Sequence, residues 1–193
     1  MADDKLRLFT AVRVPHDRLE WLDAAVGDLK GLPGARWTSV EHQHVTLNFL
    51  GWVEARLLPA VVEAVDAAVA EHSPAELALD ALGAFPRARR ARVLWAGIDD
   101  PRGLLPALAR DLGERLRAVG YEPEKRDYTA HLTLARLKAP RSVEGLLPQL
   151  PATPAPFVVD RVTLFRSRLS PSGARYEALH EAYLSASGAG RPE

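Results

Sequence analysis

His44-Val-Thr-Leu-Asn-Phe-Leu50 and His131-Leu-Thr-Leu-Ala-Arg-Leu137 are the two stretches of this sequence that decide its fold. Each opens with His-x-Thr-Leu and alternates polar and apolar residues there, which is typical of a β-strand with one face on the core. Residues two apart on a strand point to the same side, so each stretch presents an imidazole and a hydroxyl together, away from the core. The residues expected on the core side are Val45, Leu47, Phe49, Leu132 and Leu134.

The elements that precede the two stretches repeat in the same order. Residues 6–14 are predicted as a strand closed by Pro15 and residues 17–29 as a helix, while residues 92–98 and 104–119 repeat this strand and helix around Pro101. The two prolines lie 86 positions apart and the two histidines 87. An internal duplication is the simplest explanation. It would place the two polar faces near a pseudo-twofold axis, where they line one cleft.

The remaining segments favour an α+β fold over a doubly wound parallel sheet, since no Gly-rich loop follows the first strand. We expect two pseudo-symmetric lobes of mostly antiparallel sheet that face each other, with outer helices and an active-site cleft between the lobes. Residues 1–184 would form this single domain, followed by a flexible tail, 185–193. The other expected elements are helices at 56–71 and 143–147, strands at 76–82, 157–168 and 174–184, and a hairpin turn at 170–173.

Composition excludes several classes of protein. The chain has 193 residues, no cysteine and a formal net charge of zero, so disulfides, thiolate nucleophiles and cysteine zinc sites are excluded. Apolar stretches are too short to span a membrane and the amino terminus is acidic, so we expect a cytoplasmic monomer without a secretory signal or membrane contact. A polyanion would need a local basic patch. The candidate is Arg87, Arg89, Arg90 and Arg92, a pattern more typical of a solvated hairpin rim.

Two imidazoles and two hydroxyls on one face suit reactions of a phosphodiester. In-line displacement at phosphorus needs one group that takes a proton from the attacking oxygen and another that gives one to the leaving oxygen. Histidine fills both roles because its ordinary pKa of about 6.5 leaves both protonation states accessible. Threonine hydroxyls can donate to the non-bridging oxygens. This scheme needs neither a metal nor another cofactor.

The other histidines have less specific interpretations. His42-x-His44 has the same-face spacing of a metal-binding pair, but no third ligand is evident nearby, so His42 is interpreted as a loop residue. His16, His72 and His180 lie at a helix start, a helix end and a late strand, where exposure or capping explains them.

The sequence resembles the 2H phosphoesterases, and among them the RNA 2′,3′-cyclic phosphodiesterases, also called 2′-5′ RNA ligase-like proteins. The paired His-x-Thr motifs carry most of this resemblance. It also includes Arg7-Leu-Phe-Thr-Ala-Val12, Arg36-Trp37, Phe85-Pro86, Val93-Leu-Trp-Ala-Gly97, Leu164-Phe-Arg-Ser-Arg-Leu169, Gly173 and Tyr176. One departure is Ala130, where the family often has proline; this alters only the entry to the strand.

The resemblance implies hydrolysis of 2′,3′-cyclic phosphate ends of RNA, or of cyclic nucleotides, to 2′-phosphates. Carried to this sequence, it makes His44 the general acid and His131 the general base, with Thr46 and Thr133 binding phosphate. Arg136 would add positive charge, although strand alternation points it away from His131 and Thr133. Phosphate binding without turnover, and 2′-5′ ligation as the reverse reaction, stay open as alternatives. The aromatic residues that could stack on a base, or belong to the core, are Trp95, Phe49 and Tyr128.

Overall fold

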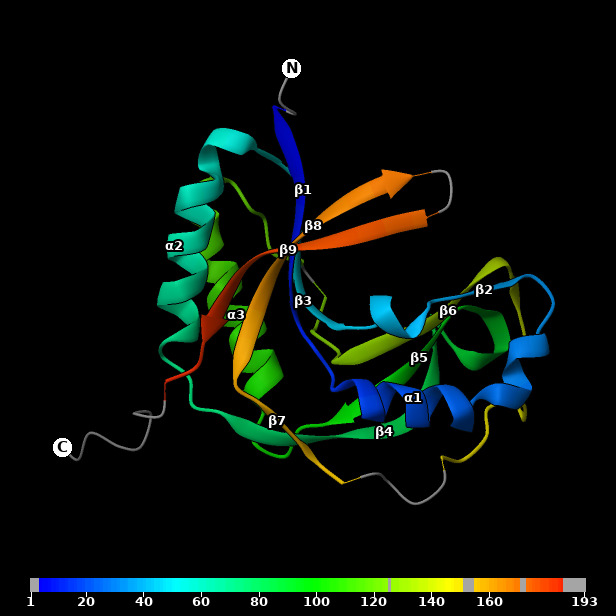
Figure 1. Ribbon diagram of the computed structural model, residues 1–193. Helices are drawn as coiled ribbons and strands as arrows, with labels where there is room; N and C mark the ends of the chain where they lie inside the picture. The colour runs from blue at the N-terminus through cyan, green and yellow to red at the C-terminus, as the bar shows by residue number, and fades with distance from the viewer. Residues whose placement is uncertain (1–3, 125, 151–154, 171–172, 186–193) are drawn as a thin grey trace.

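A few α-helices are interspersed among antiparallel strands in the computed structural model, which describes residues 4–124, 126–150, 155–170 and 173–185 (Figure 1). The α-helices are α1 (His16–Ala25), α2 (Leu58–Val69) and α3 (Leu104–Leu116). The strands are β1 (Lys5–Val12), β2 (Ala35–Trp37), β3 (Val45–Glu54), β4 (Ala75–Phe85), β5 (Ala91–Asp99), β6 (His131–Arg141), β7 (Phe157–Val159), β8 (Arg161–Ser170) and β9 (Gly173–Tyr183).

The strands follow the order β7-β4-β5-β6-β3-β1-β8-β9, and β2 pairs with β6. The pairings between them are antiparallel. The half that ends with β6 meets the half that begins with β3 through the pair Val45 and Leu132. The predicted α+β class and mostly antiparallel sheet are confirmed, whereas the two expected sheets join into one at this pair.

The two halves of the sheet exchange helices. Although α1 follows β1, it lies beside β4 (Figure 1), where Trp21 shares a cavity with Leu79 and Leu82. Although α3 follows β5, it packs with α2 against the other half, and the side-chain amide of Asn48 in β3 donates to the carbonyl of Ala109 at 3.0 Å. One hydrophobic core therefore runs through both halves.

The sequence of α3 explains its place. The Asp100 carboxylate accepts hydrogen bonds from the backbone N–H groups of Leu104 and Leu105, at 3.0 and 2.7 Å, and so caps the helix. Leucines recur at three- and four-residue steps and are buried, each contributing about 1.5–3 kcal/mol. No helix among the described residues has the length and hydropathy needed to cross a membrane.

Three predicted details differ from the structure. The strand predicted at 157–168 is divided at Asp160 into β7, which pairs with β4, and β8, which pairs with β1 and β9. Residues 143–147 form a turn instead of a short helix, because Gly145 has a φ of 70°, which right-handed helix does not allow. The short strand β2 occupies a segment for which the sequence indicates no strand, since its strand character comes from pairing with β6. The predicted β8–β9 hairpin is confirmed by the pairing of Ser170 with Gly173. The predicted tail lies outside the described residues except for Ser185.

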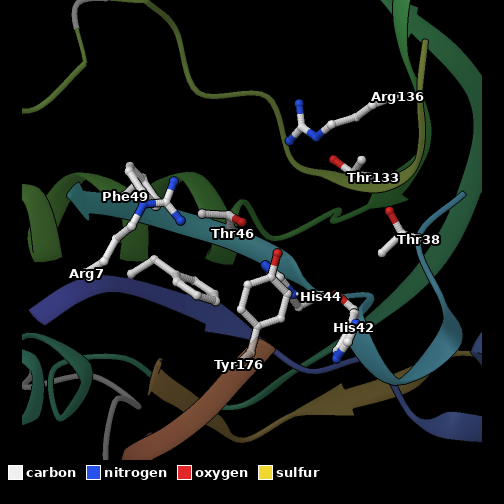
Figure 2. A pocket seen from close by; sticks show the side chains of 10 residues that line it. Arg7, Thr38, His42, His44, Thr46, Phe49, Thr133, Arg136 and Tyr176 are labelled. Atoms are coloured by element: carbon white, nitrogen blue, oxygen red, sulfur yellow. Dashed lines mark hydrogen bonds between the residues drawn. The ribbon is translucent and has the colours of Figure 1, made fainter. Parts of the chain in front are cut away.

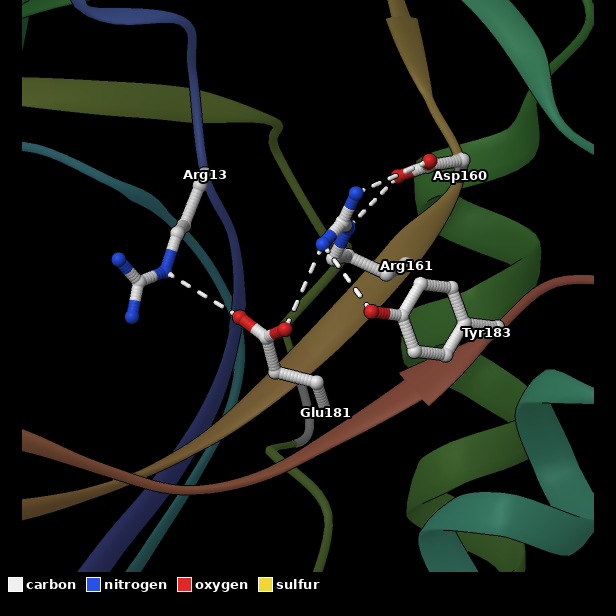
Figure 3. Close-up of polar contacts among 5 residues, drawn as sticks. All are labelled: Arg13, Asp160, Arg161, Glu181 and Tyr183. Carbon is white, nitrogen blue, oxygen red and sulfur yellow. Dashed lines mark hydrogen bonds and ion pairs between the residues drawn. The ribbon is translucent and has the colours of Figure 1, made fainter.

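A polar network orients the β8–β9 pair beside β1 (Figure 3). Arg161 donates to both oxygens of Asp160, at 2.9 and 3.2 Å, and to Glu181 and the Tyr183 hydroxyl at 3.4 and 3.2 Å. The other oxygen of Glu181 lies 4.0 Å from Nε of Arg13. Such exposed pairs each contribute less than about 1 kcal/mol. Their structural consequence is that Arg13 is held beside β9.

Candidate active site

The two His-x-Thr motifs meet where the halves of the sheet join. Val45 pairs with Leu132 in an antiparallel register, and both side chains are buried. Extending that register by one residue places His44 and Thr46 opposite the second motif's threonine and histidine, on the face away from the core. Diagonal neighbours across such a pair lie on the order of 7–8 Å apart. This separation leaves room for a phosphate group between two imidazoles.

A bulge in β6 brings Arg136 to the same face. Neighbouring residues of β5 pair with Thr133 and Ala135, which leaves Leu134 as an extra residue. Leu134 and Ala135 are both buried, so the alternation of sides changes phase, and Arg136 lines one pocket with Thr133. The prediction that strand alternation points Arg136 away from Thr133 is therefore wrong, because it assumed a strand without a bulge.

The first motif has the equivalent bulge. Neighbouring residues of β1 pair with Thr46 and Asn48, so Leu47 is the extra residue of β3. Leu47 and Asn48 are buried, and Phe49 is 42% exposed and lines the pocket with Thr46. The predicted core position of Phe49 is therefore wrong. Phe49 and Arg136 each stand five residues after a motif histidine, so the two strands have the same irregularity at equivalent positions.

The central pocket has a volume of about 320 Å³, and His44, Thr46, Thr133 and Arg136 line it together. Figure 2 shows the two hydroxyls and the guanidinium group of Arg136 directed toward the space between β3 and β6. Four of the five residues predicted for the site therefore lie around one pocket.

His131 lines an adjoining larger cavity of about 1080 Å³, which shares Thr46 and Phe49 with the central pocket. The Phe85 ring contacts the His131 imidazole edge-on, with ring centres 5.0 Å apart. The Nδ1 atom of His131 lies 2.8 Å from the carbonyl oxygen of Thr129. Because a carbonyl can only accept, Nδ1 carries the hydrogen and Nε2 is left for proton exchange.

His44 is oriented in the same way but is more enclosed. Its Nδ1 donates to the carbonyl oxygen of His42 at 2.9 Å, which again leaves Nε2 for proton exchange. The Phe9 ring stacks on the imidazole with centres 4.8 Å apart, and the Tyr176 ring meets it edge-on at 5.1 Å. Each motif histidine thus fixes its ring through the carbonyl two residues before it.

This enclosure lowers the pKa of His44 to about 4, chiefly because burial removes water from the charged form. The charges of His42, Arg13 and His131 lower it further, while the hydrogen bond to the His42 carbonyl opposes them. The guanidinium of Arg13 lies over the ring of Phe165, 5.1 Å from its centre. His44 is consequently neutral near pH 7 when the pocket holds no anion.

The lowered pKa of His44 predicts a pH-dependent stability. Above pH 6.5 the imidazole is neutral in the folded and the unfolded chain; between pH 6.5 and 4 only the unfolded chain binds the proton. The free energy of unfolding should therefore decrease as the pH is lowered from 6.5 to 4, by up to about 3 kcal/mol. Denaturant unfolding of wild type and His44→Gln at several pH values measures it. Identical pH slopes for the two proteins would contradict the prediction.

Arg7 and Tyr176 also line the central pocket, and the periodicity of the sequence did not identify them as site residues. Arg7 donates to the hydroxyl of Ser167 at 2.8 Å, and its guanidinium lies 4.5 Å from the centre of the Phe49 ring. Figure 2 shows both side chains on the β1 and β9 side of the pocket. The sequence could not place them there without the order in which the strands pair.

The other aromatic candidates have structural contacts. The Tyr128 hydroxyl donates to the carbonyl of Thr46 at 3.0 Å, and Tyr128 lines the larger cavity. Trp95 packs against Phe85 with ring centres 5.1 Å apart, so it supports the wall beside His131. Phe49, the most exposed of the three candidates, is the one that faces both cavities.

His42 is more than a loop residue, because it lines the central pocket and contacts the ring of Tyr176 edge-on. Among the described residues, no third histidine, aspartate or glutamate gathers with His42 and His44 as a metal-binding group. The basic run 87–92 surrounds the turn between β4 and β5 with all four arginines exposed, as expected for a solvated rim. Within it, Arg89 pairs with Glu144 at 2.7 Å.

Comparisons with known proteins show the family to which this chain belongs. The model of the 2′-5′ RNA ligase superfamily matches residues 20–170. Three similar curated proteins are named RNA 2′,3′-cyclic phosphodiesterase. That of Geobacillus stearothermophilus is 31% identical over 89% of this chain and 55% of its own length. That of Archaeoglobus fulgidus is 33% identical, over 69% and 73%. That of Methanothermobacter thermautotrophicus is 30% identical, over 89% and 95%. The chain thus spans about half the length of the Geobacillus protein.

Solved structures share the fold. The protein TT0787 of Thermus thermophilus aligns with a TM-score of 0.78 and 27% identity, over 94% of this chain and all of its own. Escherichia coli LigT in its apo form gives 0.75 and 26%, over 95% and 99%. LigT complexed with 3′-AMP gives 0.77 and 25%, over 93% and 98%. Since the family match extends over most of the chain, including both His-x-Thr strands, this protein belongs to the 2′-5′ RNA ligase superfamily.

Proposed function

We propose that this protein hydrolyses the 2′,3′-cyclic phosphate at the end of an RNA to a 2′-phosphate, with His44 as general acid and His131 as general base. The observation that carries the proposal is the antiparallel pairing of the two motifs at Val45 and Leu132, a register that directs both imidazoles to one face. The names of the similar curated proteins support the same substrate class.

In this mechanism, Nε2 of His131 takes a proton from a water molecule that attacks phosphorus. The bond between phosphorus and the 3′ oxygen breaks, and Nε2 of His44 gives that oxygen a proton. The phosphate remains on the 2′ oxygen, and the ribose gains a 3′-hydroxyl. Both histidines keep their Nδ1 hydrogen throughout, because each Nδ1 donates to a backbone carbonyl.

The acid role of His44 depends on substrate binding. Burial lowers its pKa to about 4 in the ligand-free pocket, so the imidazole lacks the proton that it must donate. A phosphate anion within about 4–6 Å favours the charged imidazole and raises the pKa again. Binding of the cyclic phosphate would therefore cause His44 to become protonated, whereas the imidazole is neutral in the free enzyme.

Three side chains are suited to hold the phosphate. The hydroxyls of Thr46 and Thr133 can donate to its non-bridging oxygens, and Arg136 can neutralise charge that builds in the transition state. Arg7 adds a second positive charge on the opposite wall, where it lies over Phe49. Phe49 is the aromatic surface suited to the terminal base, since its ring is exposed at the boundary of both cavities.

The test is incubation of the purified chain with a 2′,3′-cyclic mononucleotide and with a short RNA that has the same end, in excess chelator. We expect a 2′-phosphate as the sole product, at a rate that EDTA does not change. Loss of turnover in EDTA would favour a metal at His42 and His44. Bound but unconverted substrate would favour a binding module, and a 2′-5′ linkage to an added 5′-hydroxyl strand would reveal ligation, the reverse reaction.

A further inference from the structure

A third cavity continues from the central pocket along β2 and β9. Its volume is about 540 Å³, within the range of sites that hold nucleotide-sized ligands. Thr38, His42, Arg136 and Tyr176 line both this cavity and the central pocket, so the two spaces are contiguous. An RNA strand whose terminal phosphate lies in the central pocket could therefore continue into this space. We refer to it as the arginine cavity.

Three arginines line the arginine cavity: Arg36, Arg136 and Arg175. Arg36 stands directly opposite Arg136 in the β2–β6 register, which puts both side chains on one face. No aspartate or glutamate is among the described residues that line this cavity.

The larger cavity beside His131 is electrostatically balanced by comparison. Its wall also has three arginines, but these are accompanied by three carboxylates. The charged residues of that wall are Arg92, Arg110, Arg126, Glu114, Glu124 and Asp127. A polyanionic backbone is therefore attracted more strongly to the arginine cavity than to this one.

The arginine cavity also has aromatic surface, because Trp37 and Tyr176 form part of its wall. Basic grooves with aromatic side chains are typical of sites for single-stranded nucleic acid, in which the cations bind phosphate and the rings contact bases. The combination is more specific than positive charge alone. It indicates a nucleotide with a phosphodiester group as the ligand.

We propose that the arginine cavity binds the phosphodiester group immediately upstream of the cyclic end, through Arg36 and Arg175. This rests on the proposed function, which places the terminal phosphate beside His44 and Arg136. The site would make the enzyme prefer RNA ends over cyclic mononucleotides. It also assigns the RNA contact to residues outside the basic run 87–92.

Binding of unreactive strands tests the proposal without turnover. Fluorescence anisotropy would measure the affinity for a trinucleotide that ends in a 2′-phosphate, and competition would measure the affinity for a 2′-mononucleotide. Both are measured for wild type, Arg36→Ala and Arg175→Ala. We expect each variant to bind the trinucleotide about 3–10-fold more weakly and the mononucleotide equally well. The slope of log K against log salt should fall by about 0.7, as for one lost contact to a single strand. Arg87→Ala, which removes an exposed arginine of the basic run, is the matched control.

A neutral methylphosphonate at the first upstream linkage identifies the group that is bound. It should weaken the wild type at least as much as Arg36→Ala or Arg175→Ala does, and it should not further weaken the double variant Arg36→Ala, Arg175→Ala. Equal losses on mononucleotide and trinucleotide would overturn the proposal. Equal binding of the neutral and the charged linkage by the wild type would also overturn it. A loss in Arg175→Ala that is confined to binding of an added 5′-hydroxyl strand would overturn it as well. Binding as expected without hydrolysis would refute the proposed function and leave the subsite intact.

Discussion

Replacing His44 or His131 with alanine is expected to lower kcat/KM for a 2′,3′-cyclic nucleotide by about 10²–10⁴, the usual cost of a lost general acid or base. Each substitution removes the Nε2 that exchanges a proton, while the backbone register that joins the motifs at Val45 and Leu132 stays in place. Binding of a 2′-mononucleotide should change much less than turnover, because the threonines and Arg136 remain. Initial rates and product-binding constants for the same preparations measure the two effects.

The control for these variants is His16→Ala, which removes an exposed histidine of α1 that faces Glu20 at 3.3 Å. It should keep full activity. The double variant His44→Ala, His131→Ala should lose less than the product of the two single losses, because the histidines act in one proton transfer sequence. Wild-type turnover in either single variant would refute the two-histidine mechanism.

The same mechanism predicts a bell-shaped pH profile whose two limbs belong to different histidines. In the pH profile of kcat, which reports the enzyme–substrate complex, the acidic limb should reflect protonation of the base and the alkaline limb loss of the proton from the acid. Because a bound phosphate anion raises the pKa of His44 from its ligand-free value of about 4, alanine at His44 should remove the alkaline limb of kcat. Loss of the acidic limb in that variant would exchange the two roles.

Much of the fold follows from local patterns in the sequence. Alternation at the start of each His-x-Thr stretch predicts the strands, and the leucine spacing of α3 predicts its buried face. The 87-residue spacing of the motif histidines predicts their pseudo-symmetric placement, which the pairing of Val45 with Leu132 confirms. These features depend on residues close together in the chain, or on a repeat that can be read directly.

The errors arise where distant strands decide the local geometry. Arg136 and Phe49 reach the pocket because bulges at Leu134 and Leu47 change the phase of each strand, and a bulge is defined by the partner strand. The strand β2 likewise exists only through its pairing with β6. Tyr176 enters the site from β9, far along the chain, because β9 pairs with β8 and β8 with β1.

The bulge in β6 has a direct functional consequence, because it determines what Arg136 does. We expect Arg136→Ala to lower kcat by about 10²–10³, the cost of removing a charged donor from a phosphoryl transition state, with a smaller change in KM. Arg136→Lys should recover part of the loss, since it keeps the charge but not the planar fork of donors.

Lys138 provides the matched control, because it is an exposed cation on the same strand, does not line the central pocket, and makes its described hydrogen bond to Gly34 through the backbone. Lys138→Ala should therefore keep wild-type kcat in steady-state assays with a cyclic mononucleotide. A strand without the bulge would point Arg136 away from Thr133 and make the two alanine variants behave alike. Equal, small effects at both positions would show that Arg136 takes no part in the reaction, and a selective loss at Arg136 would identify the bulge as the feature that brings a cation to the phosphate.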